Sequence, residues 1–307
     1  MDMHELIDPF SKLLEDICAP GAVRAIEAGG DSAPMWQGFV DSGFLDALVD
    51  ESAGGAGLAL SEVAPLLALL GRHAVPLPVG ETMIARALLA RAGAEVPAGP
   101  IAIITGASAT PFAAVASHFL TGSPDAPVLA ARTPQPTGVF GDTGAMVSLG
   151  GSAGLRPMAA ILRALLISGA ADRVMEMTVA YANERSQFGK PIGKQQAVQQ
   201  QLAVLAEQAV AARIAGAIGA RSGLLPRVFD AAVAKHGASL AAVQISVIAH
   251  AVHGAIGVSE EYDLQLLTRR LHEWRLADGS EGYWAGILGA QRAALPSMPT
   301  TEFIRAA

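Results

Sequence analysis

The residues best suited to chemistry form a short run over residues 184–192, followed by Gln196. A cation, Arg185, an amide, Gln187, and an aromatic ring, Phe188, stand within four residues of each other. Arginine pairs with phosphates, glutamine bonds phosphates or base edges, and an aromatic ring covers a flat ring system. The run therefore indicates a site for an anionic ligand with a flat ring. The alternative is a helix-loop-helix corner whose Arg and Gln cap carbonyl groups.

This run resembles the signature of the acyl-CoA dehydrogenase family, in which Arg-x-x-Phe-Gly-x-x-(aliphatic)-x-x-x-Gln belongs to FAD binding. Every defined position is filled, by Arg185, Phe188, Gly189, Ile192 and Gln196. The resemblance implies FAD as the cofactor, with Arg185, Gln187, Phe188 and Gln196 among its contacts. It also implies a tetramer in which this corner of one subunit reaches FAD held mainly by another.

A second stretch resembles the last helical segments of the same family. It runs from His253-Gly254 through the pair Glu261-Tyr262 to Ala277-Asp278-Gly279-Ser280. Counted from the Glu-Tyr pair, Asp278 falls where the family has its catalytic glutamate, and Gly279 and Ser280 match the following Gly and Thr. The resemblance implies Asp278 as the catalytic base, cofactor contacts at Gly254, Gly279 and Ser280, and substrate contacts at Ala277 and Gly279.

The chemistry of such enzymes explains why a carboxylate belongs at this turn. The α-proton of a thioester is weakly acidic, so the thioester must be polarised and then deprotonated by a positioned base, while the β-hydride passes to the flavin. A carboxylate in an apolar pocket has a raised pKa and suits that task. A backbone N–H at the same turn helps to hold the thioester oxygen, and a glycine after the base leaves that backbone open.

Asp278 is one methylene shorter than glutamate, and a base displaced by about 1 Å loses on the order of a hundredfold in rate. Either the pocket brings substrate and backbone closer, or the chain lacks efficient chemistry. Asp278-Gly279 also suits an ordinary turn. Glu281, three residues further on, is an alternative base or a solvated side chain.

Other polar residues have simpler interpretations. Arg156 is a candidate for coenzyme A phosphates, or it faces solvent at a helix start, and Ala160 stands where many family members have a CoA-side arginine. His250 and His253 are expected in the core or at a helix end. Glu260 and Glu261 are expected to begin a helix, where its dipole favours carboxylates.

Composition limits the possible functions. The 307 residues are 51% hydrophobic but only 5% aromatic, a mixture that favours close-packed helices. The net charge of −7 provides no basic field for nucleic acid.

A single cysteine, Cys18, excludes an internal disulfide and favours a cytoplasmic protein. Five acidic residues among the first 16 argue against a signal peptide. The stretch 237–257 lacks charged residues but contains polar ones, so we expect a buried helix rather than a membrane span.

The elements that must position these residues fall into three expected regions: an N-terminal helical domain over 1–97, a reduced β region over 98–154 and a C-terminal helical bundle over 155–307. A loop of glycines at 54–57 precedes a helix and weakly resembles the family's N-terminal domain. Short apolar runs predict strands at 101–105, 112–119, 127–131 and 139–149. The family's β domain is larger and has a Trp-(aliphatic)-Thr-Asn segment beside the flavin, which this chain lacks.

Apolar periodicity predicts four antiparallel helices in the C-terminal half. The first three carry Leu162 to Arg173, Val198 to Ala209 and Leu240 to Ala251, and the third begins after Pro226. The fourth is expected from Ser259, as N-cap, to Arg275. The expected fold is mainly α, acyl-CoA dehydrogenase-like, and no Glu-x-x-His pair or other metal motif occurs on these helices.

Two functions follow. The first is an FAD-dependent acyl-CoA dehydrogenase that desaturates an acyl-CoA of fatty acid or steroid side-chain type and passes electrons to electron-transfer flavoprotein or a similar acceptor. The second is a non-catalytic subunit that completes the FAD site of a partner chain. The reduced β region, the missing tryptophan segment and the aspartate at the base position favour the second, and both imply a homo- or hetero-tetramer.

Overall fold

The computed structural model describes residues 3–106, 109–130, 132–137, 143–147 and 153–305. The N-terminal part consists of helices α1 Met3–Ile17, α2 Pro20–Glu27, α3 Ala33–Ser42, α4 Leu60–Arg72 and α5 Val79–Arg91, with the short 3-10 helices η1 Phe44–Asp46 and η2 Glu51–Ala53. The glycine loop at 54–57 leads directly into α4, as predicted.

A small β region follows. β1 Ile101–Ile103 pairs in parallel with β2 His118–Ser123, which pairs antiparallel with β3 Ala126–Ala130. A second pair is formed by β4 Gln135–Pro136 and β5 Ala145–Met146. The register aligns Ile101 with His118 and Phe119 with Ala130.

The prediction of a strand over 112–119 is wrong for most of that range. Residues 111–115 form turns, and the strand begins only at His118. Phe112 has a left-handed backbone (φ +60°) and is buried, with the guanidinium carbons of Arg163 and Arg270 5.7 and 5.5 Å from its ring centroid. The apolar run therefore fills the core next to two cations instead of pairing along a sheet. Part of the predicted strand 139–149, and residue 131 of another, lie outside the described residues.

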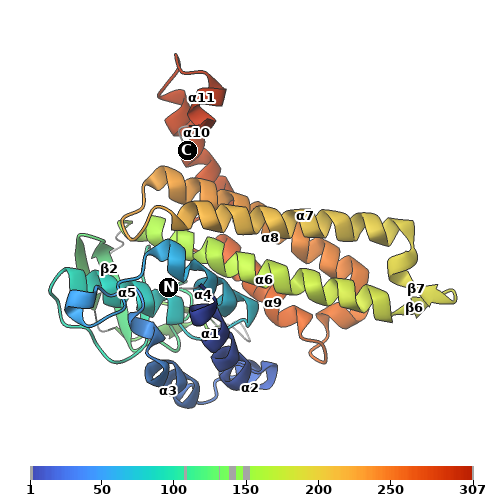
Figure 1. The fold of residues 1–307 in the computed structure, drawn as a ribbon, viewed down its shortest axis with the longest axis horizontal. Helices are drawn as coiled ribbons and strands as arrows, with labels where there is room; N and C mark the ends of the chain where they lie inside the picture. The colour runs from blue at the N-terminus through green and yellow to red at the C-terminus, as the bar shows by residue number, and fades with distance from the viewer. Residues whose placement is uncertain (1–2, 107–108, 131, 138–142, 148–152, 306–307) are drawn as a thin grey trace.

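The C-terminal half is the predicted helical bundle (Figure 1). It consists of α6 Arg156–Glu184, the hairpin β6 Ser186–Gln187 and β7 Lys190–Pro191, η3 Ile192–Lys194, α7 Gln196–Ala220, α8 Val228–His253, η4 Gly254–Val258 and α9 Leu264–Leu276. α10 Glu281–Ala293 and α11 Thr300–Arg305 stand away from the body at the top of Figure 1, while the β6–β7 hairpin lies at the far end of the bundle.

The start of the fourth bundle helix differs from the prediction. α9 begins at Leu264 rather than after Ser259. The Ser259 hydroxyl instead accepts a hydrogen bond from the Glu261 amide, two residues ahead, which makes a local turn. Glu260 and Glu261 therefore lie in this turn, exposed, and do not begin a helix.

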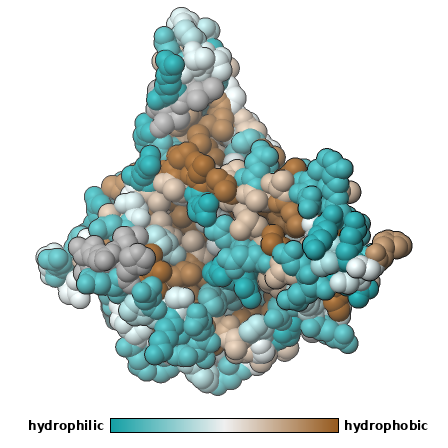
Figure 2. Space-filling model, turned by 45° about the vertical axis from the view of Figure 1, so that its right-hand side comes forward, coloured by the Kyte–Doolittle hydropathy of each residue, from teal (hydrophilic) through white to brown (hydrophobic). Residues whose placement is uncertain are grey.

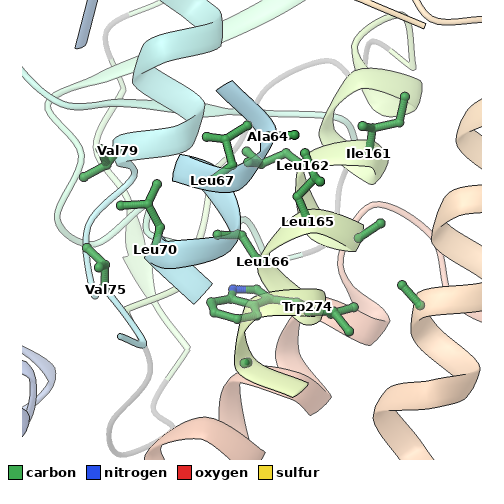
Figure 3. Packing of buried hydrophobic residues seen from close by; sticks show 14 of the residues in the cluster. Ala64, Leu67, Leu70, Val75, Val79, Ile161, Leu162, Leu165, Leu166 and Trp274 are labelled. Atoms are coloured by element: carbon green, nitrogen blue, oxygen red, sulfur yellow. The ribbon is translucent and has the colours of Figure 1, made fainter. Parts of the chain in front are cut away.

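α6 is the central helix, and it crosses α4 through glycine contacts. A Cβ on Gly169 would stand 1.7 Å from the Ala68 carbonyl oxygen, and one on Gly71 would stand 2.0 Å from that of Leu166. Figure 3 shows Leu67 and Leu70 of α4 beside Leu162 and Leu166 of α6, with Trp274 of α9 next to Leu166. Side chains of the N-terminal helices and of the bundle thus share one hydrophobic core.

Two helical stretches, Gln196–Ala220 and Val228–Val258, are long and apolar enough to cross a membrane by length and composition. Half of the most apolar window of the second stretch is buried inside the fold, and α8 packs against α6, α7 and α9. Leu240 and Val247, which helped to predict this helix, are 47% and 61% exposed, whereas alanines such as Ala238 and Ala241 face the core.

Candidate functional site

Asp278 stands in a tight turn between α9 and α10. Its backbone is left-handed (φ +57°), as is that of Gly279 (φ +105°). Aspartate tolerates this conformation better than most residues. A Cβ on Gly279 would come within 2.6 Å of Tyr283 and 2.7 Å of Trp284, so only glycine fits. Ser280 then starts α10 as its N-cap by accepting a hydrogen bond from the Tyr283 amide. The Asp-Gly-Ser sequence therefore specifies the turn.

The Asp278 carboxylate points into the protein and is held by two side chains. Its Oδ1 accepts a hydrogen bond from the Thr105 hydroxyl (2.6 Å), and its Oδ2 accepts one from Nε of Arg163 (3.0 Å). The Arg163 side chain is fully buried and also pairs with Glu81. Burial raises the pKa of Glu81 above its ordinary value, although the Arg163 guanidinium opposes that shift. Asp278 is thus part of a buried cluster of charges.

Lys235 of α8 adds a second buried cation to this cluster. Its Nζ donates to the Ser239 hydroxyl (3.0 Å) and to the carbonyl oxygens of Arg275 (2.7 Å) and Gly279 (2.9 Å). Burial lowers the pKa of Lys235 to about 7, against the effect of the nearby Asp278 charge. With Glu81, Arg163 and Asp278, Lys235 forms a buried cluster of two acidic and two basic side chains.

Sequence reasoning missed Glu81, Thr105, Arg163 and Lys235. A signal was present for two of them. Arg163 interrupts the apolar run from Met158 to Ile167, and Lys235 stands among alanines in α8. A lone charge in a buried helical stretch needs a partner, because charged groups are almost never fully buried unpaired. The partner itself was not predictable, since Asp278 lies 115 residues from Arg163 in the chain.

Arg156, the predicted substrate contact, lies at the same turn. Its guanidinium donates to the Thr105 carbonyl oxygen (2.9 Å) and to the Tyr283 hydroxyl (3.0 Å), and it stands 5.2 Å from the Tyr283 ring centroid. It is half-buried, at the first residue of α6. The structure thus brings together Arg156, Ala277, Asp278, Gly279 and Ser280. Glu281, the alternative base, instead forms an ion pair with Arg275.

The second group of predicted residues lies on the β6–β7 hairpin and the start of α7. Arg185, Gln187 and Gln196 are exposed, and Phe188 is 94% exposed with a left-handed backbone (φ +54°). Among the described residues, the side chains of Arg185, Gln187 and Gln196 have no hydrogen-bond or ion-pair partner. A phenylalanine held outward beside an unpaired arginine and two amides fits a flat, anionic ligand, and the capping role considered for Arg185 and Gln196 is not observed.

Gly254 lies near the same end of α6 as the hairpin, because the preceding residue, His253, contacts Tyr181 of α6. It ends α8 with a left-handed backbone (φ +64°). The neighbouring His253 is buried, stacks on Tyr181 of α6 (centroids 4.4 Å apart) and bonds the Ala249 carbonyl oxygen. Burial lowers the pKa of both His250 and His253. Both histidines therefore serve packing at the helix end, as predicted.

The two groups lie at opposite ends of α6. This helix has 29 residues, which at a rise of about 1.5 Å per residue makes it roughly 43 Å long. Arg156 begins it, and Arg185 follows its last residue. Within one chain, a ligand on the exposed hairpin is therefore far from the Asp278 turn.

Comparison with known proteins agrees with this architecture. A model of the acyl-CoA dehydrogenase C-terminal domain matches residues 157–292. The acyl-CoA dehydrogenase IpdE2 of Mycolicibacterium smegmatis is 31% identical over 287 residues, which cover 87% of this chain and 91% of that protein. The chain belongs to the acyl-CoA dehydrogenase family.

Solved structures show the same fold. The ChsE4–ChsE5 complex from Mycobacterium tuberculosis contains a chain that matches with a TM-score of 0.80 at 22% identity and covers 95% of this chain and 97% of that one. The Tcur3481–Tcur3483 steroid ACAD matches with a TM-score of 0.80 at 23% identity and covers 97% of this chain and 99% of that one.

Proposed function

We propose that this chain takes part in the FAD-dependent α,β-desaturation of an acyl-CoA thioester, as one subunit of an oligomer. The observation that carries the proposal is the separation of the Arg185 hairpin from the Asp278 turn by the length of α6. In such an oligomer, the hairpin of one chain completes the site at the Asp278 turn of another chain. One structural relative is described as the ChsE4–ChsE5 complex and another carries the paired name Tcur3481–Tcur3483, which supports a heteromeric assembly. We further expect a cytoplasmic protein that delivers electrons to electron-transfer flavoprotein or a similar acceptor.

The residues of the hairpin suit the FAD that this function requires. Arg185 would bind the pyrophosphate with charge-assisted hydrogen bonds, and Gln187 and Gln196 would bond the same phosphates or the adenine edge. The Phe188 ring would cover a flat ring system. Gly254 lies near the hairpin end of α6, where His253 stacks on Tyr181, and is a further proposed contact. Gly279 and Ser280, at the other end of α6, would contact the FAD that the hairpin of another chain holds. When bound, FAD supplies the acceptor for the β-hydride.

At the other end of α6, Asp278 would remove the α-proton of the thioester. Gly279 is half-buried with a left-handed backbone, and an N–H at this turn would stabilise the negative charge that develops on the thioester oxygen. Ala277 would line the substrate site at the same turn. Arg156, half-buried beside Tyr283, would bind the phosphates of coenzyme A.

A second candidate function is a non-catalytic subunit that only completes the flavin site of a partner. One observation favours it. Both Asp278 oxygens already accept hydrogen bonds from Thr105 and Arg163, and the residue is 8% exposed. To accept the substrate proton, Asp278 would have to use a lone pair that Thr105 and Arg163 leave free.

One spectroscopic experiment separates the two functions. The assembled protein is purified, its flavin absorbance is recorded, and acyl-CoA thioesters are added without oxygen. We expect the flavin band to bleach, and we expect Asp278→Asn to retain flavin but lose the bleaching, because the amide keeps the size of the side chain but cannot accept the proton. Glu281→Gln, on the same turn, is the matched control and should bleach normally. Bleaching of Asp278→Asn at the wild-type rate would remove Asp278 as the base and leave the second candidate.

A further inference from the structure

Lys235 is completely buried, yet no carboxylate among the described residues forms a hydrogen bond with its ammonium group. Two of its three acceptors are backbone carbonyl oxygens, at Arg275 and Gly279. Burying an ammonium group is costly unless its protons are bonded. The three bonds therefore make this lysine tolerable, and their location indicates what it does there.

The two carbonyl groups lie on either side of the Asp278 turn. Arg275 is in the last turn of α9, where carbonyl oxygens lack helical donors, and Gly279 directly precedes the N-cap of α10. One ammonium group on α8 thus binds both ends of the segment that contains Ala277 and Asp278. The neighbouring His236 adds a contact to the Glu281 carbonyl oxygen (3.1 Å).

The turn needs such support because of its backbone. Asp278 and Gly279 are successive residues with positive φ, and a non-glycine residue in that region persists only where its surroundings hold it. The direction of the Asp278 carboxylate depends on this conformation. On the outer side, the turn is closed by the ion pair of Arg275 and Glu281, whose side chains are partly exposed. The inner side is held by Lys235.

We propose that Lys235 is a positioning residue, which holds the turn 277–280 against α8 and thereby fixes the direction of the Asp278 carboxylate. This inference rests on the proposed function, in which Asp278 reacts with the substrate. It assigns a role in the reaction to a residue on a different helix that does not touch the substrate.

The test compares three variants of the assembled, flavin-containing protein. Lys235→Met removes the donors and keeps most of the apolar stem, and Lys235→Arg restores donors. Lys12→Met, the same substitution at an exposed lysine of α1, is the matched control. Amide hydrogen exchange of peptides covering residues 275–285 reports the mobility of the turn. Steady-state kinetics with an acyl-CoA that bleaches the flavin separate kcat from KM.

We expect Lys235→Met to exchange faster in this segment alone and to lose tenfold or more in kcat, on the order of what a displacement below 1 Å costs, at nearly unchanged KM. Lys235→Arg should recover part of both, and Lys12→Met should change neither by more than about twofold. Unchanged exchange in Lys235→Met, or faster exchange with wild-type kcat, would overturn the proposal. A wild-type assembly that does not turn over refutes the proposed function instead, and the exchange measurement still decides whether Lys235 holds the turn.

Discussion

At the scale of single residues, the Asp278 turn combines a predicted residue with surroundings that no local pattern reveals. Family resemblance identified Asp278, Gly279 and Ser280 by their spacing from the Glu261-Tyr262 pair. Their surroundings include Arg163, which bonds Asp278, and Lys235, which bonds Gly279, and both come from other helices. Pairing between such distant charges is set by the packing of α5, α6 and α8, so it follows from the fold and not from the sequence near residue 278.

The buried Lys235 makes stability depend on pH. Its folded pKa is about 7, below the ordinary 10.5 that it regains on unfolding. Between these values the unfolded chain binds a proton that the folded chain lacks, so this group makes folding more favourable as pH rises through that window, by up to about 1.4 kcal/mol per pH unit. The charges facing it are Asp278, Arg163, Glu281 and Arg275.

The prediction is checked by urea unfolding of wild type and Lys235→Met between pH 7 and pH 9. The free energy of unfolding of the wild type should gain on that of the variant as the pH rises. The variant serves as the reference because all other titrating groups are common to both proteins. Parallel pH profiles would mean that Lys235 keeps its ordinary pKa in the folded protein.

At the scale of elements, the helices were largely predictable and their ends and outer faces were not. Apolar periodicity predicted α6, α7 and α8 because each of these helices buries residues at helical spacing. The start of α9 was wrong because Ser259 caps a local turn, a use of serine that competes with helix capping. The exposure of Leu240 and Val247 was also not expected, because periodicity gives an apolar stripe but not the element that covers it.

The crossing of α4 and α6 depends on Gly169. A Cβ at this position would stand 1.7 Å from the Ala68 carbonyl oxygen. Gly169→Ala should therefore push the helices apart and lower the free energy of unfolding by about 1–3 kcal/mol or more. Gly286→Ala in α10 is the matched control, because a Cβ there meets nothing within 4 Å, and it should stabilise by roughly 0.5–1 kcal/mol. Equal effects of the two substitutions in urea titrations would contradict the close crossing.

At the scale of the whole molecule, the chain presents surfaces that suit assembly. Figure 2 shows apolar surface at the base of the projecting C-terminal arm. The exposed hairpin carries Arg185 and Phe188 away from the Asp278 turn of its own chain. The family signature predicted these residues, whereas the separation of the two groups became evident only from the length and direction of α6.

Arg185→Ala should weaken flavin retention in the assembled protein, because it removes a charge-assisted contact worth about 1.5–3 kcal/mol, or roughly ten- to a hundredfold in affinity. Lys190→Ala, an exposed cation on the same hairpin, should retain flavin like the wild type. Flavin released per chain on denaturation measures both. Equal retention in Arg185→Ala and the control would mean that the hairpin does not bind the cofactor.

The most direct measurement is an experimental structure of the flavin-loaded assembly, in which the nearest distance from the Arg185 guanidinium to a flavin phosphate is determined. We predict hydrogen-bonding distance to a flavin whose ring system lies beside a different chain from the one that contributes that arginine. An Arg185 that faces solvent in every subunit, with the flavin held by a single chain, would contradict the account.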